Sequence, residues 1–173
     1  MSAGAREGTV VGVQRSPGGV PKLAVTGPVQ VTAEGLEGDW QLDRKHHGGP
    51  DRAVCLFAHE VIEALAREGH PVSAGSLGEN LTLGGLDWSL LGGGAVLRVG
   101  DALTLEITRA AHPCKTIAHC FADGAFVRVS EKTSPGSSRM YARVLQSGVV
   151  SVGDPVVITQ PRRSAIEPDP IDD

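Results

Sequence analysis

Aromatic residues, cysteines and long apolar runs are all scarce in this chain. Phe, Trp and Tyr make up 3% of its 173 residues, and no apolar stretch approaches the roughly 18 residues of a membrane span. The opening residues, MSAGARE, lack the hydrophobic core of a secretory signal. These absences predict no contact with a membrane and a cytoplasmic location.

Basic runs are missing as well, and the formal net charge is −4, which excludes nucleic acid as an expected partner. The three cysteines are an odd number, so a disulfide framework is not expected in a reducing compartment. Cys55 lies in an apolar run and is predicted to fill the core. Cys120 is either core filler or a second thiol near a site.

Glycine and proline are abundant, with 23 and 11 residues, and this composition is typical of many turns and short elements. The length suits one domain. We predict a mostly β fold, a single antiparallel β-barrel with a few short helices, over residues 8–160. Residues 1–7 are predicted to be a flexible N-terminus and residues 161–173 a disordered tail.

Short runs of aliphatic and β-branched residues predict the elements of this barrel. The predicted strands are 8–13, 20–25, 29–32, 53–58, 81–83, 95–99 and 103–107. Residues 139–145 and 149–152 predict a hairpin, 59–67 a helix, and 113–130 short helical pieces. Two similar segments, 97–105 and 150–158, each predict a strand, a Gly-Asp turn and another strand, which is typical of the corners of a small barrel.

Cys114 follows the predicted strand 103–107 and is preceded by a proline. Its neighbours His112 and Lys115 are potential cations, and cationic neighbours favour a reactive thiolate, which is both a nucleophile and a soft-metal ligand. The alternative is a buried structural cysteine, because free cysteine is among the most buried residue types. Local sequence leaves the two alternatives open.

Two polar loops have the composition of ligand-binding segments. Residues 43–52 carry three cations, two histidines and two glycines, which suits a phosphate or another oxyanion. Residues 75–82 offer small residues, an amide and hydroxyls that can hydrogen-bond a heterocycle. The glycines at 92–94 lack the strand-to-helix context of a dinucleotide motif and predict a loop between strands.

Zinc binding and cysteine hydrolysis are weaker alternatives. The potential zinc ligands are His112, Cys114, His119 and Cys120. Their spacing matches no usual zinc pattern, and the chain has no CxxC pair. Candidate bases for a Cys-His hydrolase exist, but no nucleophile elbow or oxyanion signature accompanies them.

Five segments in register resemble the MOSC domain, the family named for the C-terminal domain of molybdenum cofactor sulfurases. The resembling segments are Gly35–Asp39 (GLEGD), His47–Val54 (HGGPDRAV), Leu77–Thr82 (LGENLT), Pro113–Cys114, and Arg139–Asp154, which begins RMYARVL and ends GD. The resemblance covers roughly residues 8–159 and is greatest to the small, stand-alone bacterial members.

This resemblance implies a β-barrel that binds the molybdenum cofactor (Mo-molybdopterin). Cys114 would be the catalytic residue, bonding molybdenum or carrying sulfur as a persulfide. The candidate cofactor-binding residues are Lys45, His47, Arg52, Gly78, Glu79, Asn80, His112, Lys115, Arg139 and Tyr141. The loop from Lys45 to Arg52 would hold the phosphate of the cofactor, and Gly78–Asn80 would hold its pterin.

The chain departs from the family pattern in two ways. Family members often have arginine three residues before the cysteine, where this chain has Ala111, so activation of the thiol must rest on His112, Lys115 or the bound cofactor. Fused sulfurases also carry a pyridoxal-phosphate desulfurase domain, for which this chain has no room. We therefore expect no pyridoxal phosphate on this chain.

Three functions follow from the resemblance. The first is a molybdenum-dependent oxidoreductase that reduces N-hydroxylated compounds with electrons from a separate redox partner, because no flavin, haem or iron–sulfur motif is visible. The second is a sulfur carrier that takes a Cys114 persulfide from a separate cysteine desulfurase. The third is a binding module that stores or delivers the cofactor without turnover.

Overall fold

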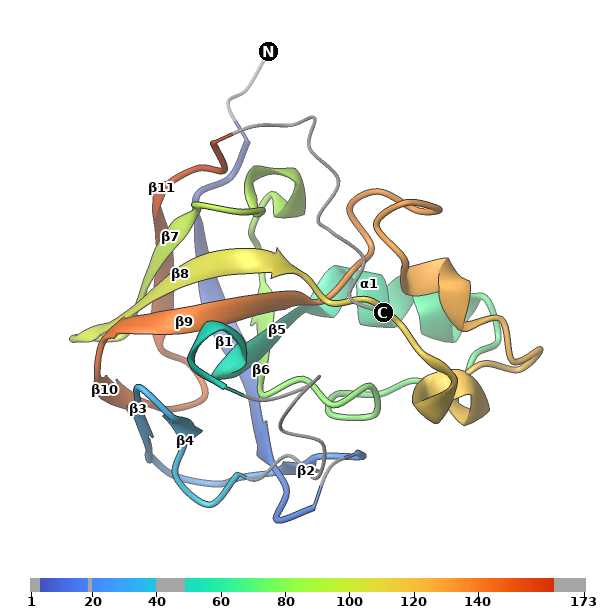
Figure 1. Cartoon of the computed structure of the whole chain (residues 1–173), viewed down its shortest axis with the longest axis horizontal. Coiled ribbons are helices and arrows are strands. Elements are labelled where there is room, and N and C mark those ends of the chain that lie inside the picture. Colours follow the sequence, from blue (N-terminus) through green and yellow to red (C-terminus); the bar gives the residue numbers. More distant parts are fainter. Residues whose placement is uncertain (1–3, 19, 40–48, 164–173) are drawn as a thin grey trace.

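Seven strands of the computed structural model close into a barrel (Figure 1). The structure describes residues 4–18, 20–39 and 49–163. In order around the barrel the strands are β11 (Pro155–Gln160), β7 (Val96–Val99), β8 (Leu103–Ala110), β9 (Met140–Gln146), β5 (Val54–Ala58), β6 (Leu81–Gly84) and β1 (Glu7–Arg15), and β1 pairs with β11 to complete the ring. Neighbours are antiparallel except β5 and β6. The predicted antiparallel barrel is confirmed.

Aliphatic side chains fill the barrel, which explains how it forms with so few aromatic residues. Strand β8 alternates as a half-buried strand should, with Leu103, Leu105 and Ile107 turned inward. Strand β5 is buried along its whole length, because the barrel lies on one face of it and a helical layer on the other.

A small second sheet covers one end of the barrel. It contains β10 (Gly148–Val150), β3 (Val29–Thr32) and β4 (Gly35–Leu36), in that order. The predicted hairpin of 139–145 with 149–152 is therefore wrong, since β10 pairs with β3 rather than with β9. The chain bends away at Gly148, where a Cβ atom would lie 2.6 Å from the backbone nitrogen of Leu103.

The two Gly-Asp segments form different structures that touch each other. The first is the turn of the β7–β8 hairpin, and the second is the corner between β10 and β11. The backbone nitrogen of Gly100 donates to the carbonyl of Pro155 at 2.9 Å. Asp154 accepts a hydrogen bond from the backbone nitrogen of Ser151, which stabilises the corner.

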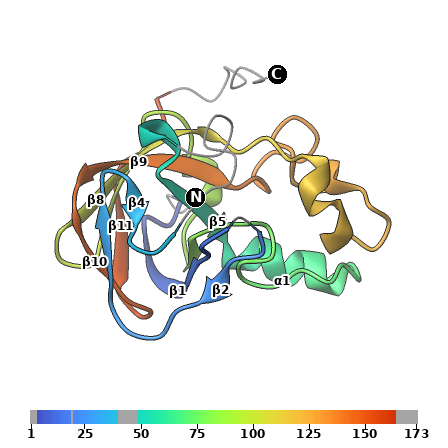
Figure 2. The same cartoon turned by 60° about the horizontal axis from the view of Figure 1, so that its bottom comes forward.

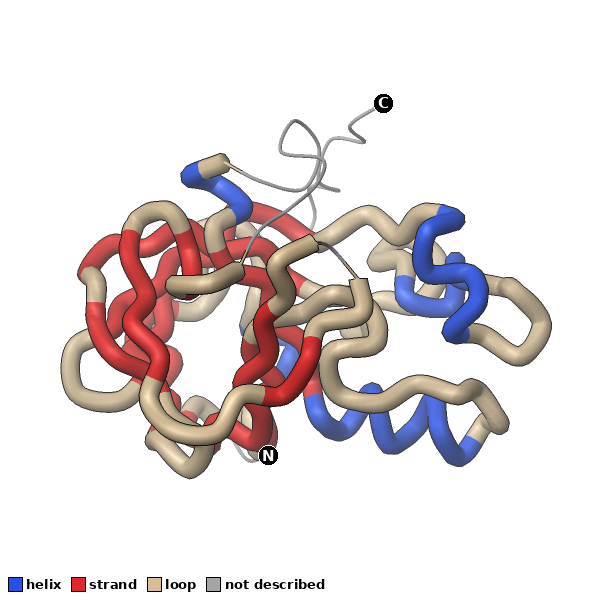
Figure 3. Tube along the Cα trace, turned by 90° about the horizontal axis from the view of Figure 1, so that it is seen from below, coloured by secondary structure: helices blue, strands red, loops and turns tan. Residues whose placement is uncertain are grey.

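The α-helix and two of the 3₁₀ helices lie together on one side of the barrel (Figures 2 and 3). The helix predicted at 59–67 is confirmed as α1 (His59–Arg67), and the short pieces predicted within 113–130 are the 3₁₀ helices η3 (Lys115–Cys120) and η4 (Phe126–Val129). A second hydrophobic cluster joins these helices to β5. Its buried members are Phe57, Ile62, Leu65, Val72, Leu77, Ile117, Cys120, Phe121 and Val129.

Two further 3₁₀ helices are η1 (Pro50–Arg52) and η2 (Trp88–Leu90), and the short strand β2 (Leu23–Ala24) pairs with the end of β1. The glycine loop at 92–94 lies between η2 and β7 as predicted, and the backbone of Arg163 donates to Gly93. Within the described residues, no helix is long and apolar enough to cross a membrane.

Gly35 should tolerate substitution less well than Gly27, although both have positive φ, at 109° and 86°. A Cβ at Gly35 would lie 2.5 Å from the carbonyl oxygen of Ala53, whereas nothing lies within 4 Å of one at Gly27. We expect Gly27→Ala to cost about 1 kcal/mol from backbone strain alone, and Gly35→Ala at least about 2 kcal/mol. Urea unfolding of both variants measures the difference, and equal costs would contradict the close approach of β4 to the barrel.

Candidate functional site

Cys114 lies where the barrel meets the helical layer. Strand β8 ends at Ala110, and Cys114 is the residue that immediately precedes η3. Cys55 and Cys120 are buried, whereas Cys114 is only half-buried. Its Sγ lies 2.7 Å from Oγ1 of Thr116, and its carbonyl accepts from the backbone nitrogen of Ile117. Of the three thiols, Cys114 alone combines a fixed backbone with partial exposure.

The residues near Cys114 differ in their exposure to solvent. His112 and Lys115 are exposed, so their predicted part in activating the thiol stays a prediction. Ala111 is 1% exposed and packs with Cys55 and Tyr141. A larger side chain at position 111 would have to displace that cluster, which gives a physical reason for the alanine.

Tyr141 and Arg52 contact each other near Cys114. Burial is the largest cause that raises the pKa of Tyr141 to about 12, and Cys114 is among the smaller contributions in the same direction. The phenol therefore stays protonated and is a hydrogen-bond donor at neutral pH. The guanidinium carbon of Arg52 lies 5.6 Å from the centre of the Tyr141 ring, within the range of a cation–π interaction. These contacts bring two predicted site residues into the neighbourhood of Cys114.

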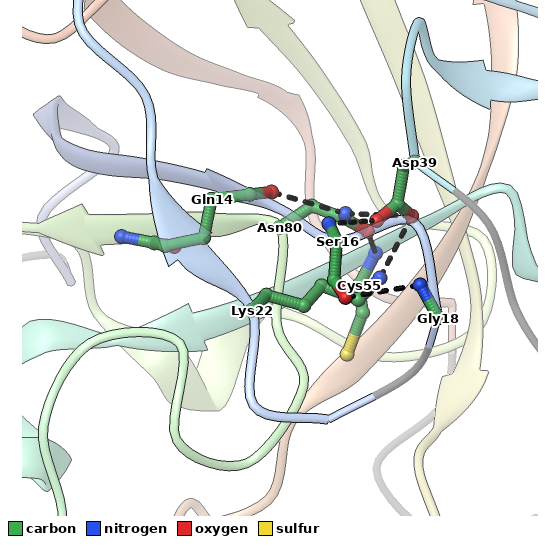
Figure 4. Close-up of polar contacts among 7 residues, drawn as sticks. All are labelled: Gln14, Ser16, Gly18, Lys22, Asp39, Cys55 and Asn80. Carbon is green, nitrogen blue, oxygen red and sulfur yellow. Dashed lines mark hydrogen bonds and ion pairs between the residues drawn. The ribbon is translucent and has the colours of Figure 1, made fainter.

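Asp39 joins three segments of the chain (Figure 4). One of its carboxylate oxygens accepts from Nζ of Lys22 at 2.8 Å and from Nδ2 of Asn80 at 3.1 Å, and the other accepts from the backbone nitrogen of Ser16 at 3.0 Å. The Lys22 side chain is fully buried. The carboxylate thus ties the β1–β2 connection and the loop before β6 to the turn that contains Asp39.

Asn80 connects this network to Cys55 on strand β5. Its Oδ1 accepts from the backbone nitrogen of Cys55 at 3.0 Å, and its own backbone nitrogen donates to the carbonyl of Cys55 at 2.7 Å. The thiol of Cys55 is buried, as predicted for core filler, and burial raises its pKa to about 11. Asn80 is therefore a structural link between the loop 75–80 and strand β5.

Glu79 and Arg139 are buried in the same region. Oε1 of Glu79 accepts from the backbone nitrogen of Gly75, and Nη1 of Arg139 donates to the carbonyl of Leu77 at 2.8 Å. Among the described residues, Oε2 of Glu79 and Nε of Arg139 have no hydrogen-bond partner. Burial is the main cause that raises the pKa of Glu79 to about 7.

Gly78 lies in the loop that these residues hold. Its φ is 90°, and a Cβ there would lie 2.5 Å from Cγ1 of Val20, so the position requires glycine. The predicted phosphate-binding residues Lys45 and His47 lie outside the described residues. The predicted cofactor-binding roles of the remaining residues stay predictions.

Cys120 is separated from Cys114 by the length of η3. At a rise of about 2 Å per residue, their Cα atoms are roughly 12 Å apart, beyond the reach of a disulfide. Sγ of Cys120 lies 3.5 Å from the carbonyl oxygen of Ser76. Within the described ranges, no group of three or more His, Cys, Asp or Glu side chains is placed to hold a metal ion, so the zinc alternative gains no support.

Sequence reasoning missed Lys22 and Asp39 as parts of the site. Asp39 is the last residue of the quoted GLEGD segment, and that motif was the available signal. No sequence signal indicates that Lys22 is buried, because a single lysine in the predicted strand 20–25 is expected to project into solvent. Its burial became evident only with its ion pair.

The chain resembles known proteins in both its sequence and its fold. A family model described as the MOSC domain matches residues 43–157. The chain is similar to "Uncharacterized protein YflK" of Bacillus subtilis (strain 168), with 35% identity over 139 residues, and to "Protein YiiM" of Escherichia coli (strain K12), with 33% over 144 residues. These matches cover 78% and 81% of this chain but only 60% and 63% of the relatives.

A more distant relative is named "Reductase", from Gibberella moniliformis (strain M3125 / FGSC 7600). It is 27% identical over 138 residues, which are 78% of this chain and 24% of that protein. Among solved structures, a hypothetical protein superposes with a TM-score of 0.68 and 29% identity, covering 94% of this chain and 70% of that chain. YiiM from Geobacillus stearothermophilus superposes with a TM-score of 0.60 and 27% identity, covering 88% and 73%.

Removing the Asp39 carboxylate should destabilise the protein strongly. Asp39→Ala leaves the buried ammonium of Lys22 without its counter-charge, which typically costs 3–5 kcal/mol, here expected at about 4 kcal/mol. The control is Glu63→Ala, because Glu63 also pairs with a side chain at 2.7 Å but on the surface, where loss costs at most about 1 kcal/mol. Similar unfolding free energies for the two variants would refute the role given to Asp39.

Glu79 should make stability depend on pH. Its pKa is raised from 4.5 to about 7 in the folded chain, so its contribution is complete below pH 4.5 and is lost as pH rises through 7. Relative to Glu79→Gln, wild type should lose on the order of 3 kcal/mol between about pH 4 and about pH 8. Chemical unfolding at several pH values measures this; parallel curves for the two proteins would show that Glu79 titrates normally.

Proposed function

This chain belongs to the MOSC domain family, and on that basis we propose that it binds the molybdenum cofactor through Cys114 and reduces N-hydroxylated compounds. The observation that carries the proposal is the placement of Cys114. It is the one partly exposed thiol of the three, and its backbone is held at the junction of the barrel and the helical layer. A thiolate is the soft ligand that suits molybdenum held by a dithiolene.

The described residues fit an anionic cofactor in two respects. The Nε of Arg139 is a buried donor that has no partner among the described residues, and such donors are normally satisfied. Arg52 brings a second guanidinium to Tyr141, whose electrostatic neighbours include Cys114. Arginine suits phosphate and other oxyanions because of its fixed array of donors. We assign Arg139 and Arg52 to the anionic groups of the cofactor.

Other side chains would orient the cofactor rather than react with it. Gly78 allows close approach of the backbone in the loop 75–80, and Asn80 fixes that loop to β5. Tyr141 remains a neutral donor. Lys45, His47, His112 and Lys115 complete the proposed set of cofactor-binding residues, and their contribution rests on the family resemblance.

The proposed reaction needs two electrons and two protons for each turnover: the N–O bond of R–NHOH breaks, and R–NH₂ and water form. When bound, the cofactor supplies two-electron chemistry. The electrons come from a separate redox partner. The relative named "Reductase" supports a reduction over other chemistries. Cytoplasmic residence and independence of membranes and nucleic acid remain part of this proposal.

A sulfur carrier is the second candidate, favoured by the same partial exposure of Cys114. In that function a separate pyridoxal-phosphate-dependent cysteine desulfurase transfers one sulfur atom to the Cys114 thiolate, and the resulting persulfide passes it on. Arg139 and Arg52 have no necessary part in this transfer. Loss of function in variants of these arginines therefore distinguishes cofactor binding from sulfur carriage.

The molybdenum content of the purified protein tests the proposal. Wild type produced in a host that makes the cofactor should contain close to one molybdenum and one pterin per chain. Cys114→Ser should lose at least about tenfold of the metal, since it replaces a soft ligand with a hard one. The matched control is Cys120→Ser, because that thiol lies at the far end of η3 and should leave the content unchanged.

Wild type without molybdenum and pterin would refute cofactor binding. Sulfur carriage then has its own measurement: intact mass after incubation with a cysteine desulfurase and cysteine. A sulfur adduct that depends on Cys114 would support the carrier, and its absence would leave neither function standing.

A further inference from the structure

Two buried charged side chains of this region, Glu79 and Arg139, form no ion pair within the described residues. Lys22 and Asp39 neutralise each other at 2.8 Å. Arg139 is 7% exposed and Glu79 is fully buried, yet no ion pair within 4 Å joins them. One atom of each, Nε and Oε2, has no partner among the described residues. The guanidinium is thus a buried cation whose only acceptor, within these residues, is the carbonyl of Leu77.

Glu79 is the group beside Arg139 that can change its charge at neutral pH. The titratable groups around Glu79 come from four segments: Lys22 before β2, Cys55 on β5, Cys120 at the end of η3, and Arg139 before β9. Lys22 is paired with Asp39, and an arginine side chain is always charged in proteins. Burial raises the pKa of both thiols, so they stay neutral. The net charge of the cluster therefore changes by one unit when Glu79 gains or loses a proton.

We propose that anion loading of this site is proton-coupled, with Glu79 taking up one proton as Arg139 receives an anionic group of the cofactor. No covalent bond forms or breaks in this step: a carboxylate plus a solvent proton becomes a carboxylic acid, and the cation that it partly compensated gains a new counter-charge. The inference rests on the proposed function and adds to it a proton-linked residue that does not touch the thiol ligand.

The direction of the coupling follows from Coulomb's law in a buried site. An anion near Arg139 repels the Glu79 carboxylate and favours its protonated form. By linkage, protonated Glu79 favours the anion to the same extent. Retention of the cofactor should therefore weaken as pH rises through the titration of Glu79. A coupling of one pKa unit corresponds to about a tenfold change in affinity.

The experiment measures molybdenum and pterin kept by the loaded full chain after dialysis at pH 6 and at pH 9. Wild type should retain the cofactor about tenfold more weakly at the higher pH. Glu79→Gln, which mimics the protonated acid, should retain it equally at both. Arg139→Gln should retain it poorly at both. Glu68→Gln is the matched control, since Glu68 is an accessible carboxylate paired with Arg128, and it should behave as wild type.

A second measurement has a readout other than cofactor retention. The side-chain carbonyl of Glu79, assigned in ¹³C-glutamate-labelled protein by its loss in Glu79→Gln, should titrate near neutral pH in the chain before loading. Loading should raise the midpoint of this titration by about one pH unit. Thermal melting of each variant checks that it is folded.

The outcomes separate the two proposals. If wild type never acquires molybdenum at any pH, cofactor binding fails and the coupling falls with it. If wild type loads but its retention is independent of pH, or if Glu79→Gln keeps the wild-type pH dependence, the coupling alone is overturned. If loading leaves the titration midpoint of Glu79 unchanged, the proton is not taken up at this residue.

Discussion

The Asp39 carboxylate is the constraint on which the arrangement of the site depends. It receives hydrogen bonds from a buried lysine and a backbone amide of the β1–β2 connection and from an asparagine of the loop before β6. A buried charge of this kind is stable only when its partners are held in place, and removing one partner is costly. The Asp39 network therefore fixes the β1–β2 connection and the loop 75–80 to each other.

The remaining features follow from where that loop is held. Asn80 links it to Cys55, Arg139 holds the carbonyl of Leu77, and the Glu79 carboxyl bonds back to Gly75. Cys55 and Tyr141 then pack with Ala111, three residues before Cys114. A closed barrel of aliphatic residues provides the rigid support, and the functional groups lie on the loops and short helices at its edge, where binding residues commonly occur.

Much of this architecture is predictable from the sequence, because strand periodicity and Gly-Asp turns are local signals. The helix at 59–67 and the strands β3, β5 and β7 appear within a residue or so of their predicted ends. The pairing of β10 with β3 was not predictable, since it depends on a close approach of Gly148 to Leu103, distant in sequence. The motifs identified Cys114, Glu79 and Asn80 as candidates. They gave no indication that Lys22 is buried, or that Glu79 and Arg139 lie together without a direct ion pair.

Together these features describe a MOSC barrel whose buried polar network supports one accessible thiol. The central claim is that this thiol is a ligand of molybdenum. X-ray absorption at the molybdenum edge of the loaded protein tests it most directly, by comparing the number of sulfur ligands in wild type and in whatever loaded fraction of Cys114→Ser can be isolated. The account predicts one sulfur ligand fewer in the variant. An unchanged sulfur shell would show that Cys114 does not bind the metal and would contradict the account.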